Sequence, residues 1–166
     1  MRKNKEDSIR PEAFAEESFM AEALKEAEAA AAEGEVPVGA VIVRGGEVIA
    51  RAHNMTEQAK DPTAHAEILA IRKAAELLGG WRLIGCSMYV TVEPCTMCAG
   101  AIVWARIEKL FIGTADPKAG ACGSLYNIPR DARLNHNVEI ETGLMGEECS
   151  NLMKDFFRKL RSEERQ

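Results

Sequence analysis

The chain has 166 residues, 46% of them hydrophobic and 28% charged. This length is typical of a single domain, and the composition excludes both a disordered chain and a collagen-like one. The net charge of −5 comes from residues 1–35, which hold ten acidic and five basic side chains, so the acidic total does not exclude a nucleic-acid partner for the neutral remainder.

The N-terminal third predicts a tail, a long helix and a hairpin. The predicted elements are a polar tail (1–10), an amphipathic helix (12–33), a β-hairpin (36–43 and 48–52) and a polar loop (53–60). Pro11 at the start of the helix and Gly34 just past its end agree with the usual asymmetry of helix ends. The hairpin is indicated by two apolar segments on either side of a turn at 44–47 that contains two glycines.

The rest of the chain alternates between helices and strands. The predicted elements are a helix (61–78), a strand (87–92), a helix (96–105), a strand (109–112), a Gly/Ala-rich loop (113–124), a strand (138–141) and a helix (145–161). Asp61 before Pro62 favours the start of the second helix, and Gly79 favours its end. This alternation predicts one α/β domain over residues 11–162, with a central sheet covered on both faces.

Two short clusters combine residue types that bind zinc. They are His65-Ala66-Glu67 and Pro94-Cys95-Thr96-Met97-Cys98, and each lies where a loop enters a predicted helix. Backbone amides and the helix dipole at such a position favour ionised thiolates. Two cysteines separated by two residues, together with a neutral imidazole, suit Zn²⁺. We therefore expect Cys95, Cys98 and His65 to bind one zinc ion.

Three protein ligands leave the fourth position of tetrahedral zinc for water, as in catalytic rather than structural sites. Zinc lowers the pKa of that water to about 7, so hydroxide becomes accessible at neutral pH. Glu67 lies two positions after His65 and points in a different direction on a helix, so it is not expected as a further ligand. We expect Glu67 to move a proton from water to a leaving group.

Two structural alternatives compete with a catalytic zinc site. A lone Cys-x-x-Cys is also typical of a redox pair or of half a structural zinc site. Cys86, Cys122 and Cys149 are interpreted as packed small residues, and His53 and His136 as loop or surface histidines. A zinc shell closed by Cys86 or Cys122 would exclude catalysis.

His-x-Glu followed by Pro-Cys-x-x-Cys is the motif of the zinc deaminases. From about Phe14 to Phe157 the chain resembles the bacterial tRNA-specific adenosine deaminase (TadA) family. The resemblance is carried by Glu35-Val-Pro-Val-Gly-Ala-Val41, Asn54, Asp61-Pro-Thr-Ala-His-Ala-Glu-Ile68, Tyr89-Val-Thr-Val-Glu-Pro-Cys-Thr-Met-Cys-Ala-Gly-Ala101, Arg106-Ile107, Gly113, Asp116, Lys118, Gly120, Gly123-Ser124 and Phe156-Phe157-Arg158. It implies a three-layer α/β/α, cytidine-deaminase-like fold whose central mixed sheet has about five strands.

The same resemblance implies hydrolytic deamination of adenosine to inosine at the wobble position of a tRNA anticodon. Each subunit of a homodimer would hold one Zn²⁺ with a bound water or hydroxide on His65, Cys95 and Cys98, and Glu67 would act as the catalytic proton shuttle. The residues implied in substrate binding are Val36, Pro37, Val38, Asn54, Ala66, Asp116 and Lys118. The apolar segment 99–104 is the candidate dimer contact.

Four cations near the C-terminus are candidate contacts to the anticodon stem-loop. They are Lys154, Arg158, Lys159 and Arg161. The structural alternative is that these cations lie at a solvent-exposed helix end and complement the helix dipole. An anticodon loop presents its bases single-stranded, so extruding one costs at most a few kcal/mol.

Two other functions remain open at this point. One is a free-base or nucleoside deaminase, such as a guanine or cytosine deaminase, which shares both metal motifs. The other is a non-catalytic zinc-binding or RNA-binding module, which would have a fourth protein ligand or no role for Glu67.

Segment hydropathy and cysteine content indicate a compartment. The chain has no run of about 18 uncharged apolar residues, so no membrane partner is expected. Residues 1–17 lack the apolar core of a signal peptide. Five unevenly placed cysteines do not make a disulfide framework. We expect a protein of the reducing cytoplasm.

Overall fold

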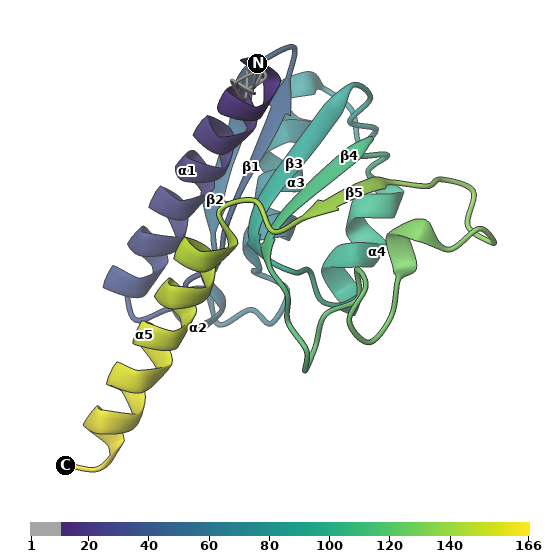
Figure 1. The fold of residues 1–166 in the computed structure, drawn as a ribbon. Coiled ribbons are helices and arrows are strands. Elements are labelled where there is room, and N and C mark those ends of the chain that lie inside the picture. The colour runs from purple at the N-terminus through teal and green to yellow at the C-terminus, as the bar shows by residue number, and fades with distance from the viewer. Residues whose placement is uncertain (1–10) are drawn as a thin grey trace, which may run out of the picture.

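The computed structural model describes residues 11–166 as a central sheet with helices on both faces (Figure 1). The elements are α1 (Pro11–Ala32), β1 (Gly39–Arg44), β2 (Glu47–His53), α2 (Thr56–Ala59), α3 (Ala66–Leu78), β3 (Cys86–Val92), α4 (Thr96–Trp104), β4 (Lys109–Thr114), the 3-10 turn η1 (Ile128–Arg130), β5 (Glu139–Thr142) and α5 (Gly146–Glu164). The predicted tail, residues 1–10, lies outside the described residues.

The five strands form one mixed sheet in the order β2-β1-β3-β4-β5. β1 pairs antiparallel with both β2 and β3, whereas β3, β4 and β5 run parallel. Parallel neighbours require crossover connections, and α4 supplies the one between β3 and β4. The predicted three-layer fold with a mixed five-stranded sheet is confirmed.

The central strands are apolar on both faces, which is why helices cover both (Figure 1). Ile42 on β1 and Met88 on β3 belong to the core beneath α3 and α4. Their neighbours Val41 and Tyr89 belong to a second core beneath α1 and α5. Successive side chains of a strand point to opposite faces, so each central strand contributes to both cores.

A missing side chain lets α1 lie directly against β1. A Cβ built on Gly39 would overlap the backbone of Ala23 and Ala27 in α1. Any larger residue at position 39 would therefore push the helix away from the sheet. The segment between the two elements, residues 33–38, is held next to the zinc-binding motifs as a result.

Three differences from the sequence prediction concern the segments around the site. α3 begins at Ala66 rather than Asp61, because the Asp61 carboxylate accepts hydrogen bonds from the backbone and hydroxyl of Thr63 and closes a separate turn. The predicted polar loop contains the short helix α2. β1 begins at Gly39, since residues 36–38 form a tight turn in which the Val38 amide donates to the Val36 carbonyl at 2.8 Å.

None of the helices within residues 11–166 combines the length and the apolar character needed to cross a bilayer.

A candidate metal centre and active site

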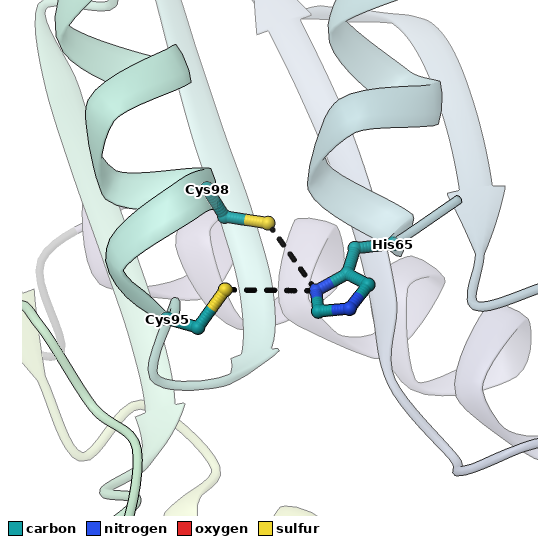
Figure 2. A group of neighbouring side chains, drawn as sticks. All are labelled: His65, Cys95 and Cys98. Carbon is teal, nitrogen blue, oxygen red and sulfur yellow. Dashed lines mark hydrogen bonds between the residues drawn. The ribbon is translucent and has the colours of Figure 1, made fainter. Parts of the chain in front are cut away.

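Two helix starts bring His65, Cys95 and Cys98 together (Figure 2). His65 immediately precedes α3, Cys95 immediately precedes α4, and Cys98 lies in the first turn of α4. Nδ1 of His65 is 3.7 Å from the Cys95 sulfur and 3.5 Å from the Cys98 sulfur. The three donor atoms all lie within 4.8 Å of one another, so one ion can be held by all three.

Contacts among these three groups shift their pKa values in directions that favour a thiolate at Cys95. A hydrogen bond from the Cys98 thiol, joined by one from His65, lowers the pKa of Cys95 to about 3. The same contact with Cys95, together with burial, raises the pKa of the Cys98 thiol. The hydrogen bond to Cys95 also raises the pKa of His65. The three groups share protons around a thiolate, and Zn²⁺ binding would displace those protons. The donor set therefore fits zinc.

Glu67 lies beside this group with an unsatisfied oxygen. Among residues 11–166, its Oε1 is the one buried side-chain nitrogen or oxygen that has no hydrogen-bond partner. The residue is 3% exposed and lines the same pocket as His65 and Cys95. A buried polar atom without a partner costs free energy, so the site is built to receive a further polar group there. Burial also raises the pKa of Glu67, which brings proton exchange closer to neutral pH.

No other described histidine or cysteine joins the three ligands. Cys86 and Cys149 are buried in the two cores, and Cys122 is buried with its sulfur 3.9 Å from the carbonyl of Pro94. His53 contacts the carboxylates of Glu26 in α1 and of Glu33 just past its end, and His136 contacts the carbonyl of Ile107. Within residues 11–166 the group therefore has three donors and no fourth.

The pocket at the metal group has a volume of about 250 Å³. Five of the residues predicted to bind substrate line it: Val36, Val38, Asn54, Ala66 and Asp116. Pro37 does not line it. The walls of the pocket are mostly apolar, with a few polar groups beside Glu67. Such a lining is usual for a pocket that binds one small organic group.

A larger cavity of about 850 Å³ adjoins this pocket, between the loop after β4 and α5. Val36 and Asp116 line both spaces, so the two are continuous. Four predicted contacts border the larger one: Lys118, Lys154, Arg158 and Arg161. Lys159 does not, because it faces the end of α1 beside Ala32. Three of the four cations predicted on α5 thus line the cavity that adjoins the pocket.

Glu93 holds the 116–124 loop in place, a role that the sequence analysis did not assign. Its Oε1 accepts hydrogen bonds from the amide of Asp116 at 3.2 Å and the hydroxyl of Ser124 at 2.5 Å. Its Oε2 accepts from the amides of Cys122 and Ser124, each at 3.1 Å. Burial alone would raise the pKa of Glu93, but these hydrogen bonds lower it overall. The charged carboxylate thereby fixes Asp116 at the pocket.

Glu35 is a second buried carboxylate that the sequence analysis left without a role. It is fully buried and accepts hydrogen bonds from the backbone of α2 and from Asn54. Both carboxylates bind partners about 20 to 30 residues away, which explains why local sequence patterns do not reveal them.

Comparisons with known proteins agree with this geometry. A family model described as MafB19-like deaminase matches residues 14–161. A curated tRNA-specific adenosine deaminase of Bacillus subtilis is 49% identical over 90% of this chain and 93% of its own length. A solved structure from work on tRNA:A34 deaminases that edit A to I at the wobble position has 47% identity and a TM-score of 0.79, covering 81% of this chain and 98% of that one. A guanine deaminase structure from Bacillus subtilis has 44% identity and a TM-score of 0.57, covering 60% and 64%.

Proposed function

The chain belongs to the tRNA-specific adenosine deaminase family, and on that basis we infer that it hydrolyses adenosine to inosine at wobble position 34 of a tRNA anticodon. The observation that carries this inference is the high identity over nearly the full length of such relatives. The pocket agrees with it, because three metal donors, a buried carboxylate and space for one base meet there. The reaction consumes water and releases ammonia.

We propose that one Zn²⁺ per subunit is held by His65, Cys95 and Cys98. The imidazole of His65 and the thiolates of Cys95 and Cys98 would hold the ion. A zinc ion with three protein ligands would supply an open coordination position and lower the pKa of water there, which is the chemistry that attack on C6 of adenine needs. Val36 and Val38, together with Asp116 and Ala119 of the 116–124 loop, line the pocket beside this group.

Glu67 is the proposed catalytic acid and base. Its carboxylate would take a proton from the attacking water and deliver it to N1 of the purine. It would then move the remaining proton of that water, from the new hydroxyl on C6, to the amine, so that the C6–N bond breaks, the C6 carbonyl forms and ammonia leaves. The unpartnered Oε1 supports this role, because the atom is free to bind the reacting groups. Burial raises the pKa of Glu67, so its protonated form is easier to reach during the cycle.

The proposed binding mode places one extruded adenine in the 250 Å³ pocket. Asn54, Val36, Val38 and Ala66 would contact the base. Asp116, held by Glu93, would meet the sugar or phosphate at the mouth of the pocket. Lys118 borders only the larger cavity, where neighbouring nucleotides would lie. Pro37 would shape the turn that carries the two valines rather than contact the base.

A substrate panel tests the activity. Purified protein should convert A34 of an anticodon stem-loop to inosine, which is sequenced as G, and should release ammonia from that RNA. Free guanine, free cytosine and adenosine should give no comparable ammonia. The guanine deaminase structure among the comparisons makes guanine the sharpest control. Turnover of a free base without turnover of the RNA would contradict the proposal.

Glycine at position 120 should be required for RNA affinity. A Cβ there would overlap the Glu93 carboxylate and approach the Asp116 carbonyl to 2.6 Å. We expect Gly120→Ala to displace the 116–124 loop and to raise KM for the stem-loop about tenfold. A tenfold change corresponds to roughly 1.4 kcal/mol, which is within the range of overpacking strain. Gly80→Ala, at a position where a Cβ meets nothing, is the matched control. An unchanged KM for Gly120→Ala would show that the loop does not position substrate.

Phosphate contacts by α5 should appear in the salt dependence of binding. We propose that Lys154, Arg158 and Arg161 face the RNA from the larger cavity, with Lys159 nearer the α1 side. Arg158→Glu should weaken stem-loop binding and reduce the slope of log K against log salt by about 0.7 for each lost single-strand contact. Lys25→Glu, the same charge change on exposed α1, should leave the slope unchanged. Equal slopes for both variants would contradict this RNA footprint.

We propose a homodimer formed through the C-terminal end of α4. Trp104 is 68% exposed and Trp81 is 50% exposed, and the Arg106 guanidinium lies 5.8 Å from both ring centroids. Exposed aromatics beside arginine are typical of interface hot spots. Sedimentation should give a dimer for the unmodified chain and for Phe14→Glu, and a monomer for Trp104→Glu. A dimeric Trp104→Glu would rule out this face.

The proposed location is the cytoplasm, together with the tRNA substrate. The site depends on thiolate ligands, and a reducing compartment keeps them from oxidising to a disulfide.

A further inference from the structure

Glu35 is a fully buried carboxylate that lies behind the base pocket without lining it. Its Oε1 accepts a hydrogen bond from the amide of Gln58 at 2.7 Å. Its Oε2 accepts from the amide of Glu57 at 3.2 Å, and from Nδ2 of Asn54 and the hydroxyl of Thr56 at 3.4 Å each. We propose that Glu35 is a positioning residue, which sets the orientation of the Asn54 amide for base binding; this rests on the proposed function.

The chemistry of a carboxylate decides which side of Asn54 faces the pocket. An ionised carboxylate only accepts hydrogen bonds, so the NH₂ group of Asn54 must face Glu35. The second hydrogen of that group faces the Thr56 hydroxyl, whose oxygen is 3.5 Å from Nδ2. The Thr56 hydroxyl donates its own hydrogen to Oε2 of Glu35. Asn54 is therefore left with Oδ1 as its acceptor toward the pocket, where an N–H or O–H of the nucleoside can bind.

The same carboxylate joins two walls of the pocket. Glu35 directly precedes the turn that carries Val36 and Val38, and both valines line the pocket. Its hydrogen bonds to Glu57 and Gln58 tie that turn to α2, whose Thr56 also lines the pocket. A buried charge is costly unless it is fully hydrogen-bonded, and four donors meet this need. The amide of Asn54 is thus fixed before substrate arrives, which lowers the entropy cost of binding.

Glu33 provides a matched control two residues away. Its carboxylate accepts hydrogen bonds from His53 at 2.9 Å and from the Gln58 side chain at 2.8 Å. It therefore bridges α1 to the same region but contacts neither Asn54 nor the pocket. Replacing either Glu33 or Glu35 by glutamine would remove hydrogen bonds from this region and lower its stability. Only the replacement of Glu35 would change the orientation of the Asn54 amide.

A double-mutant cycle tests the proposal on the zinc-loaded enzyme with the anticodon stem-loop. Glu35→Gln keeps the shape of the side chain but turns a donor toward Asn54 or Gln58. We expect KM to rise about tenfold with kcat changed less than about threefold, a loss typical of one hydrogen bond to a charged group. In an Asn54→Ala background, the added Glu35→Gln should change KM less than about twofold, because residues that act through each other are not additive.

Metal content and melting temperature accompany each kinetic measurement. Glu33→Gln should leave KM unchanged, and all variants should keep one zinc per chain. If Glu35→Gln does not fold, Thr56→Val removes one hydroxyl from the same network and should show a smaller KM effect that also disappears without Asn54.

Two failures are distinguishable. A wild-type enzyme that does not edit the stem-loop contradicts the proposed function. A wild-type enzyme that edits normally, with Glu35→Gln raising KM by equal factors in both backgrounds, contradicts the positioning role alone.

Discussion

Replacing Glu67 by glutamine should abolish deamination while the metal stays bound. Glutamine keeps the size of the side chain but cannot take a proton from water. General acid–base catalysis contributes about 10² to 10⁴ in rate, so we expect kcat for A34 deamination to fall by about 10³ or more. Elemental analysis should still find one zinc per chain, because Glu67 is not among the three grouped donors.

The control for this variant lies on the same helix. Glu76→Gln removes an exposed carboxylate from α3 and should leave both kcat and zinc content unchanged. Turnover by Glu67→Gln within tenfold of wild type would refute the shuttle. Loss of zinc from Glu67→Gln would instead assign this residue to the metal shell, and the unpartnered Oε1 would then have a different explanation.

Replacing Cys98 by serine should remove both the metal and the activity. Serine is a poor ligand for Zn²⁺ compared with a thiolate, and the remaining pair, His65 and Cys95, would hold the ion weakly. Changes in the groups that merely support ligands cost 10- to 100-fold in affinity or activity, so loss of a ligand should exceed about 100-fold. Dialysis against a mild chelator followed by elemental analysis measures the loss of zinc.

Cys122→Ser is the matched control for that experiment. Cys122 is buried and its sulfur lies near the carbonyl of Pro94, next to Cys95 in the sequence. It is therefore a cysteine close to the metal group that is not one of the three donors. We expect Cys122→Ser to retain zinc and turnover. Zinc retention by Cys98→Ser together with loss from Cys122→Ser would mean that the ligand set has been assigned to the wrong cysteine.

The metal group was predictable because its determinants are local. Cys95 and Cys98 are three residues apart at a helix start, and His65 and Glu67 lie in a single turn. The two motifs meet in the structure, and the mixed five-stranded sheet explains why. β2 and β3 both pair antiparallel with β1, so they run in the same direction. α3 follows β2 and α4 follows β3, so both helices begin at the same edge of the sheet and pack on the same face.

The supporting network could not be predicted because its partners are remote in sequence. Glu93 binds Ser124, 31 residues away, and Glu35 binds Asn54, 19 residues away. Each glutamate lies in a stretch that carries the family resemblance, but the sequence assigns it no partner, and only the fold shows that it is buried and hydrogen-bonded. These two carboxylates hold Asn54 and Asp116, which would touch substrate.

The wrong start predicted for α3 has a local cause. Asp61 carries the pattern of a helix cap, but its side chain closes a turn on Thr63 and α3 starts five residues later. This shift is functionally important, because it leaves His65 as the residue that precedes the helix. The backbone there is extended, and the imidazole can reach the cysteines.

X-ray absorption at the zinc edge tests the central claim most directly. In the proposed site the polypeptide supplies three ligands and leaves one position open to solvent, and residues 11–166 offer no fourth grouped donor. The spectrum should fit two sulfurs near 2.3 Å and two nitrogen or oxygen atoms near 2.0 Å, of which one is displaced by a purine hydrate analogue. A third sulfur, or a shell that the analogue leaves unchanged, would contradict a catalytic zinc.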